Sequence, residues 1–540
     1  MEKKSNIEFY TWGEKVASEL KKRKVKKHVV HGMWTPSGYF HIGNARPEVF
    51  TPAIAYEALL SAGLKAEFNL FFDDFDDFEG IPEGIKADRA KFKQYIGLPL
   101  KEVPSPDSKY SNWAEFFEQQ IVGVIGEFGV RPNFLSSYDN YKQGKYDKAI
   151  KIVLENSDEV LGIWEEIVGK KPRGLPVMAR CEKCKRTLTT LSTKYDGSYL
   201  HYSCEQEVKG MKGCGHKGKI KPEKGAAKLP WRLHWPATWF IFGTTFESGG
   251  KDHFTVGGSI DTGKAFAEKI FKIQPPLLVG TDFVTVDDKK MSGSLGNVIS
   301  MADWLEFAEP ELLRFLYVSS SPKKVINFDL KSSKFFFLAD RYDRAERIYF
   351  GKLREKDKQE GEKTLEQAKR QYRASQIKLA KKMPAQLSYS YAVLIAQTRN
   401  ITHEGEILAT LKNFGYAALE SDDKKRILNR IILAKNWLDK YAPEELKIVI
   451  VDRVDAKLKK DLNKIEKEAI LDLNKVLKQD VTGDELQPQI YEISKKHGVE
   501  PKRFFELLYR IIINKPQGPK LGPFIVALGR ERVAKLLAQV

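Results

Sequence analysis

The chain of 540 residues is too long for one ordinary domain and predicts about three to five, each with its own core. Hydrophobic residues make up 42% and charged residues 30%, a balance that excludes a disordered chain, and the formal charge of +18 favours a polyanionic partner, nucleic acid first. No apolar run approaches the roughly 18 residues of a membrane-spanning helix, and the start, MEKKSNIEFYTW, lacks the apolar core of a signal peptide. We therefore expect a cytoplasmic protein without a membrane partner.

The first predicted elements form a βαβ unit over residues 26–78. A short apolar strand at Val29 and Val30 leads into a loop at 33–38, a helix follows over 45–60, and Gly63 ends that helix. A second buried strand is expected over 68–72. Four aspartates stand at its carboxyl end, and ligands of such sheets bind beyond the carboxyl ends of the strands. These aspartates are Asp73, Asp74, Asp76 and Asp77.

The cysteines form one cluster in the sequence, after a stretch at 95–175 that we expect to be helical. A secreted disulfide framework is smaller and denser in cysteine, whereas four thiolates complete a tetrahedral zinc site. Two alternatives remain open: His201 or His216 could replace one of the later sulfurs, and the cysteines could be four unrelated thiols. We predict a structural zinc ion held by Cys181, Cys184, Cys204 and Cys214.

Residues 228–243 are rich in aromatic side chains. The segment after them contains a near-match to a nucleotide-binding motif. Residues 258–264 match most of a phosphate-binding P-loop, but Ala265 stands where Ser or Thr must hold magnesium. We therefore exclude a P-loop NTPase. Short strands are expected to return at 277–279 and 283–284.

The chain becomes helical and charged beyond residue 322. Residues 351–400 hold 12 Lys and Arg against 5 Asp and Glu. Apolar residues at helical spacing predict amphipathic helices over 427–438 and 458–476. The last third is therefore expected to be all-helical, with a basic surface.

A first motif with phosphate-binding chemistry, TPSGYFHIGN, occupies residues 35–44 in the first strand-to-helix turn. Gly38 and Gly43 permit close backbone approach, and a helix N-terminus favours phosphate. His41 and Asn44 add neutral or cationic hydrogen-bond donors.

A second motif, KKMSGS at 289–294, offers Lys290 and the two hydroxyls of Ser292 and Ser294 to a polyphosphate. Each motif alone is weak, because small glycine- and serine-rich turns are common. Their order, and their separation by about 250 residues, are specific.

Together the two motifs resemble the HIGH and KMSKS signatures of class I aminoacyl-tRNA synthetases, with Asn44 in the place of the last histidine and Gly293 in that of a lysine. The chain is more closely similar to the class I lysyl-tRNA synthetases of archaea and bacteria. This resemblance runs from residue 35 to 522. It is carried by TPSG at 35–38, PWR at 230–232, GKDH at 250–253, DTG at 261–263, KMSGSLGNV at 290–298 and GPKLG at 518–522.

The resemblance implies an α/β fold: a Rossmann-type parallel-sheet catalytic domain with a zinc-bearing insertion, followed by an all-α C-terminal region. The expected ranges are 1–95 and 228–300 for the two halves of the catalytic domain, 96–227 for the insertion with its zinc module at 175–222, 301–350 for a junction that contacts the tRNA stem, and 351–540 for a helical anticodon-binding region.

The resemblance also implies the activity, which is ATP-dependent activation of lysine to lysyl-adenylate and transfer to tRNA(Lys) by a monomeric enzyme that uses Mg²⁺. In this scheme His41, Asn44 and Lys290 stabilise the charge that builds on the phosphates. The expected ATP contacts are Gly38, Gly43, Met291, Ser292 and Ser294, and the expected amino-acid contacts are Thr35, Trp231, Asp252 and His253.

Three positions near the expected amino-acid pocket differ from the family pattern. His234 stands where Asp is usual, Thr281 where Tyr is common and Phe72 where Trp is common. The alternative function is therefore a class I aminoacyl-tRNA synthetase for a different amino acid. A lysine ammonium needs a carboxylate or an aromatic face, and the candidate carboxylates are Asp73, Asp74 and Asp252.

Overall fold

The computed structural model describes residues 9–286, 288–291, 298–416 and 418–540. The chain forms two compact units. The first unit contains the described residues of 1–304, 313–328 and 354–379, and the second contains those of 305–312, 329–353 and 380–540. Residues 354–379, which we expected in the C-terminal helical region, therefore pack with the first unit.

The first unit is built on a five-stranded parallel sheet with the strand order β12-β11-β1-β2-β3. The α/β expectation is confirmed. β1 pairs with β2 along its whole length, from His28 opposite Ala66 to Trp34 opposite Phe72. The strands are β1 (His28–Trp34), β2 (Ala66–Phe72), β3 (Asn133–Ser136), β11 (Phe246–Gly250) and β12 (Leu277–Thr281).

Two of these strands were not expected. β11 reads FESGG, so it has no apolar run, although four of its five residues are buried. β3 is four residues long and half exposed, and it lies within 96–227, the segment expected to be the insertion. Short edge strands and polar buried strands give weak sequence patterns.

The two faces of the sheet are covered by different helices. Met33 and Phe71 pack in one apolar cluster with residues of α9 (Trp231–Phe242) and α10 (Ser259–Lys269). Side chains alternate between faces along a strand, so Gly32 faces the other side, where α3 (Thr51–Ser61) and α1 (Trp12–Lys21) pack. A Cβ on Gly32 would come within 1.9 Å of the Glu48 carbonyl oxygen. Only glycine permits the helical backbone to lie so close to β1.

The predicted helix over 45–60 is present but is not uniform. It consists of α2 (Ile42–Ala45), a π-helical turn (Arg46–Phe50) and α3. The π turn contains Pro47 at its start. Such turns are rare and are found most often at functional sites.

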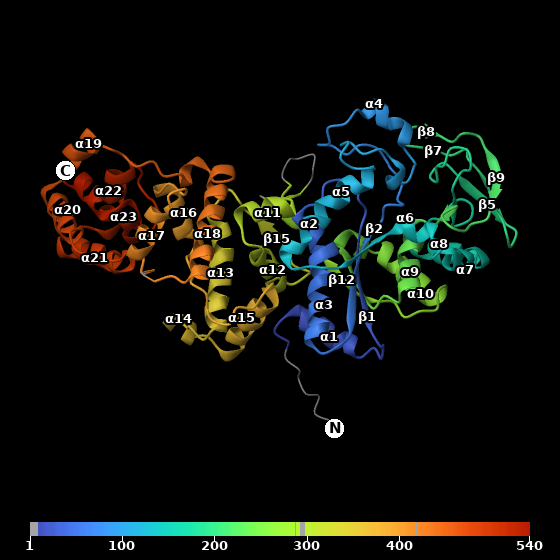
Figure 1. Ribbon diagram of the computed structural model, residues 1–540, viewed down its shortest axis with the longest axis horizontal. Helices are drawn as coiled ribbons and strands as arrows, with labels where there is room; N and C mark the ends of the chain where they lie inside the picture. The colour runs from blue at the N-terminus through green and yellow to red at the C-terminus, as the bar shows by residue number, and fades with distance from the viewer. Residues whose placement is uncertain (1–8, 287, 292–297, 417) are drawn as a thin grey trace, which may run out of the picture. The chain divides into compact units, whose positions relative to one another are not determined.

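The cysteine-containing module is a small antiparallel sheet with the order β5-β6-β9, seen at the right of Figure 1. A two-residue pairing between β4 (Met178–Ala179) and β10 (Ala227–Lys228) joins the segments that enter and leave it. Its strands are β5 (Leu191–Tyr195), β6 (Leu200–Ser203) and β9 (Lys217–Ile220).

A second small sheet carries the later motif. β13 (Val284–Val286) pairs in parallel with β15 (Ile326–Phe328) and antiparallel with β14 (Lys289–Lys290). The segment at 283–284 thus enters a separate sheet instead of extending the five-stranded one.

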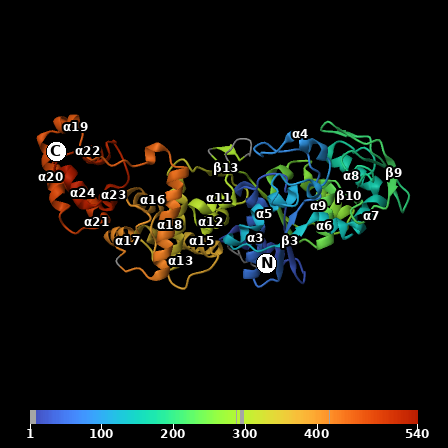
Figure 2. The same ribbon diagram turned by 45° about the horizontal axis from the view of Figure 1, so that its top comes forward.

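The second unit is helical in the residues that the structure describes, as expected. α16 (Tyr389–Thr398) and α18 (Ser421–Lys440) lie side by side in both views (Figures 1 and 2). The helix expected over 458–476 is interrupted at Leu462 between α19 (Ala456–Asp461) and α20 (Lys464–Val476). α21 (Gly483–Lys496), α22 (Pro501–Ile513), α23 (Leu521–Leu528) and α24 (Arg530–Leu537) complete the apolar core around α20.

Candidate active site

The first motif folds into a capping box at the start of α2. The Nδ1 of His41 accepts a hydrogen bond from the Asn44 backbone N–H at 3.2 Å, and the Asn44 Oδ1 accepts from the His41 N–H at 3.4 Å. Because Nδ1 is an acceptor, a neutral His41 carries its proton on Nε2. Burial and the charge of Lys290 lower the pKa of His41 to about 4. Histidine is therefore a neutral donor here, and the amide of Asn44 keeps its NH₂ group for a ligand.

The two motifs meet at Gly43. A Cβ added there would lie 2.9 Å from the His41 ring and 2.9 Å from the methyl carbon of the buried Met291. Glycine thus permits the side chain of the second motif to pack on the turn of the first. The structure gives no similar need at Gly38, where a Cβ would meet Pro82 at an ordinary 3.7 Å.

Lys290 extends from β14 at the surface. Its Nζ lies 4.2 Å from the centre of the Phe283 ring and 3.3 Å from the Asp252 carboxylate. Asp252, an expected amino-acid contact, has 69% of its side chain exposed and pairs with Lys290. Ser292 and Ser294 lie outside the described residues.

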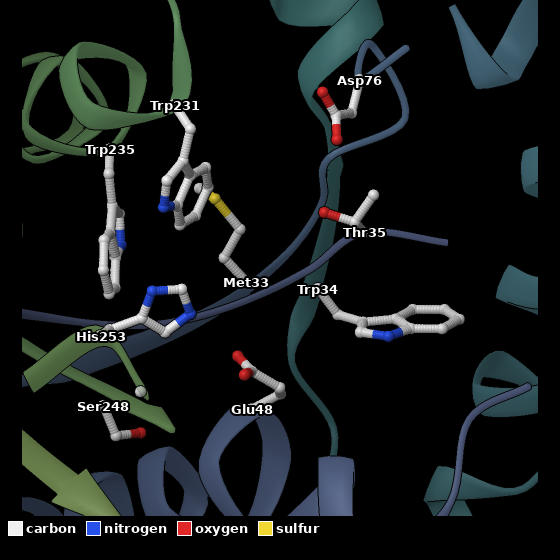
Figure 3. Close-up of a pocket in the computed structure, with 10 residues that line it drawn as sticks. Met33, Trp34, Thr35, Glu48, Asp76, Trp231, Trp235, Ser248 and His253 are labelled. Atoms are coloured by element: carbon white, nitrogen blue, oxygen red, sulfur yellow. The ribbon is translucent and has the colours of Figure 1, made fainter. Parts of the chain in front are cut away.

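A cavity of about 290 Å³ opens beyond the carboxyl ends of β1 and β11 (Figure 3). Three of the predicted amino-acid contacts, Thr35, Trp231 and His253, line it, and Asp252 does not. Trp231 stacks on Trp235 with ring centres 4.9 Å apart. The buried Nε1 of Trp231 has no hydrogen-bond partner in the part of the chain that the structure describes. The other lining residues are Met33, Trp34, Glu48, Asp76, Trp235, Ser248 and Gly249.

Two carboxylates of this cavity, Glu48 and Asp76, lie on opposite sides of it in Figure 3. Burial and the nearby Glu247 raise the pKa of Glu48 well above its usual value, although the backbone N–H of Met33 opposes this shift. Glu247 is fully buried and accepts hydrogen bonds from the indoles of Trp235 and Trp239. Burial still raises the pKa of Glu247 to about 8. A cation bound beside Glu48 would favour the charged form of this carboxyl.

The other acidic candidates have partners within the fold. Asp74 accepts from Ser136 Oγ at 2.5 Å and from the Tyr138 N–H at 2.7 Å. Asp73 is buried, and its carboxylate lies 3.7 Å from the Nε2 of His234. Lys228 Nζ lies 2.9 Å from Asp77 and 3.2 Å from Asp76. Asp76 is the partly exposed member, with 47% of its side chain accessible.

The three positions that depart from the family pattern lie beside the cavity but do not line it. His234 is buried against Tyr146, and its Nδ1 lies 3.0 Å from the Tyr141 hydroxyl. Phe72 stacks on Phe134 with ring centres 5.7 Å apart. Thr281 is buried at the end of β12. These three residues therefore pack behind the cavity and add no charged group to its lining.

Sequence reasoning missed Glu48, Ser248 and Trp235 as cavity residues. Glu48 had a weak signal: it is one of three charged residues, with Arg46 and Glu57, in the mainly apolar helical pattern over 45–60. Ser248 lies on β11, a strand that the sequence pattern did not predict, so no signal in the sequence marked it.

The cysteines meet at one point. Their four sulfurs lie within 4.8 Å of one another, and the Cys181–Cys214 and Cys184–Cys204 sulfur distances are both 3.6 Å. A tetrahedral zinc ion with Zn–S bonds of about 2.3 Å needs sulfurs about 3.8 Å apart, so the donor set fits a metal. His201 pairs with Asp196 at 2.9 Å, and His216 lies 3.9 Å from Glu182. In the described chain, the group that could hold a metal contains these four cysteines and no histidine.

The family model of class I tRNA synthetases (K) matches residues 10–378. The lysine–tRNA ligase of Thermococcus kodakarensis is 35% identical over 97% of this chain and 99% of its own length. The chain belongs to the class I lysyl-tRNA synthetases. Among other members of this family, the lysine–tRNA ligase of Methanocaldococcus jannaschii is 35% identical over 97% of this chain and 98% of its own length. That of the bacterium Borrelia garinii subsp. bavariensis is 32% identical over 98% and 99%.

Among solved structures, the glutamate-tRNA synthetase of Elizabethkingia anophelis covers 95% of this chain and 99% of its own, with a TM-score of 0.40 and 11% identity. None of the described helices is both long enough and apolar enough to cross a membrane.

Proposed function

We propose that this protein is a lysine–tRNA ligase, which activates lysine with ATP and transfers it to tRNA(Lys). The observation that carries the proposal is the pair of carboxylates, Glu48 and Asp76, on opposite sides of a cavity walled by tryptophans. Lysine has two ammonium groups, whereas most amino acids have one. Each ammonium can pair with one carboxylate.

The substrate carboxylate also has a partner in this arrangement. The Trp231 Nε1, a buried donor without a partner among the described residues, lines the same cavity. His41 caps α2, and Glu48 lies in the π turn that follows this helix, so the first motif and the cavity are neighbours on one segment. Proximity of the two reactants is the main requirement of adenylate formation, because attack of the substrate carboxylate needs no protein nucleophile.

The charge on the triphosphate is the second requirement, because the reaction brings one anion to another. The Nε2–H of the neutral His41 and the NH₂ of Asn44 would donate hydrogen bonds to the phosphates, and Lys290 would stabilise the leaving pyrophosphate. A magnesium ion bound with ATP would neutralise further charge. Gly38, Gly43, Met291, Ser292 and Ser294 remain the proposed ATP contacts.

The proposal assigns zinc to the four cysteines as a structural ion and tRNA(Lys) as the nucleic-acid partner of a cytoplasmic monomer. By resemblance to its family, activation requires tRNA. The test is ATP–pyrophosphate exchange with each of the twenty amino acids, with and without tRNA. We expect exchange with lysine in the presence of tRNA. Exchange with a different amino acid and none with lysine would refute the lysine assignment, and exchange with lysine alone would refute the requirement for tRNA.

A further inference from the structure

Arg46, the second residue after Asn44, is a buried cation that the proposed chemistry does not use. Its side chain is 2% exposed and ranks among the largest fully buried ones. Its described hydrogen-bond partners are main-chain carbonyl oxygens from two distant segments. They are Asp282 at 2.8 Å, Ser321 at 2.8 Å, Lys324 at 2.8 Å and Phe283 at 3.5 Å.

Those two segments are the ones that build the small sheet bearing Lys290. Asp282 and Phe283 join β12 of the main sheet to β13, whose Thr285 pairs with Lys290. Residues 321–324 lead into β15, the parallel partner of β13. One guanidinium thus holds the two chain segments that lead into the sheet.

Phe283 links Arg46 to Lys290. The centre of the Phe283 ring lies 4.2 Å from the Lys290 Nζ, and the carbonyl of the same residue faces Arg46. At its other end, Arg46 follows directly on α2, the helix that His41 caps. The side chain therefore connects the turn of the first motif to the strand of the second.

Arginine suits this position better than lysine would. Its planar fork donates from Nη1 to Asp282 and Lys324 and from Nη2 to Ser321. A lysine ammonium is a compact point charge and cannot reach all these carbonyls from one place. Three hydrogen bonds with different directions fix an orientation, whereas a single one permits rotation.

We propose that Arg46 is a positioning residue, which sets the distance between Lys290 and the His41–Asn44 turn and so the rate of adenylate formation. This inference rests on the proposed function. It predicts that Arg46 acts on the rate through Lys290 and leaves the lysine-binding cavity unchanged, because Arg46 does not line that cavity.

The experiment is a double-mutant cycle in the full-length protein, with single-turnover adenylate formation in the presence of tRNA as the measurement. Lys290→Ala should slow the step about 100-fold. Arg46→Lys should slow it by roughly 10–100-fold, the scale of a misplaced catalytic group, with little change in the KM for lysine. In the Lys290→Ala background, Arg46→Lys should have less than about a 3-fold effect, because the group that it positions is gone.

Arg314 provides a matched control. It is also buried in the first unit and donates to the carbonyls of Ser375 and Phe128 and to Glu57. Arg314→Lys should lower thermal stability, and its effect on the rate should be the same with and without Lys290. Where Arg46→Lys does not fold, Arg46→Gln replaces it in the cycle, with the same non-additivity expected.

Two results would overturn the inference. If wild type activates lysine and the Arg46→Lys and Lys290→Ala losses multiply, Arg46 only stabilises the fold while the proposed function stands. If wild type activates no lysine, the proposed function fails and the positioning role fails with it.

Discussion

Replacing Glu48 by glutamine removes a carboxyl group that a bound cation would ionise, and it keeps the shape of the cavity. Glutamine has almost the same volume, and its Oε1 can still face the backbone N–H of Met33. The change therefore tests the charge and not the packing. Because burial and the neighbouring Glu247 raise the pKa of Glu48 well above its usual value, this carboxyl is costly to ionise in the free protein, and we expect the Glu48→Gln protein to be at least as stable as wild type.

The magnitude follows from the interaction that is lost. A hydrogen bond between charged groups contributes about 1.5–3 kcal/mol, which corresponds to roughly a 10–100-fold weaker affinity for lysine. The measurement is the KM for lysine in tRNA-dependent pyrophosphate exchange, with calorimetric lysine binding as a second readout. We expect KM to rise within this range, with a smaller change in the KM for ATP.

Two variants make the result specific. Glu67→Gln removes a surface carboxylate of β2 that is paired with Lys27, and it should leave KM unchanged. Asp76→Asn should raise KM less than Glu48→Gln, because Asp76 is half exposed and already paired with Lys228. An unchanged KM in Glu48→Gln would refute the assignment of Glu48, and a larger rise of KM in Asp76→Asn would make Asp76 the principal ammonium contact.

Three further predictions concern the motifs, the metal and the pH dependence. Gly43→Ala should slow adenylate formation by roughly 10–100-fold, because the new methyl group meets His41 and Met291 at 2.9 Å. Gly38→Ala should be tolerated, and equal single-turnover rates for the two variants would contradict this prediction. Elemental analysis of protein purified without added metal should find about one zinc ion per chain, and Cys184→Ser should lower the midpoint of thermal unfolding. An active protein without metal would exclude the zinc site. The affinity for lysine should increase as pH rises from about 4.5 to about 8, because protonated Glu48 and Glu247, whose pKa values are raised, cannot pair with an ammonium. This pH dependence should be weaker in Glu48→Gln, and a flat calorimetric profile in wild type would refute the coupling.

The sequence predicted the elements whose chemistry is local. The βαβ unit, the apolar strands at 68–72 and 277–279 and the cysteine cluster each depend on spacing within a short segment, and the structure contains them. The capping box of His41 and Asn44 is also local, although its consequence for the tautomer of His41 needed the hydrogen-bond geometry.

The cavity could not be predicted in the same way, because distant segments assemble it. The candidates for the ammonium were Asp73, Asp74 and Asp252, chosen for their place after a strand or beside a motif. The structure gives Asp74 partners within the fold and places Asp252 beside Lys290. Glu48 lines the cavity instead, because a π turn on the helix after β1 carries it there. Neither the turn nor the polar strand β11 has a periodic signal.

The central claim, that this chain attaches lysine to tRNA, is tested most directly by identifying the esterified amino acid. Wild-type protein is incubated with ATP, Mg²⁺, unfractionated tRNA and all twenty amino acids at equal concentration, and the 3′-terminal aminoacyl-adenosine is identified by mass spectrometry after nuclease digestion. We predict lysyl-adenosine as the product, at a yield that falls in Glu48→Gln when lysine is kept below its KM. A different aminoacyl-adenosine, or uncharged tRNA with folded, zinc-loaded protein, would contradict the account.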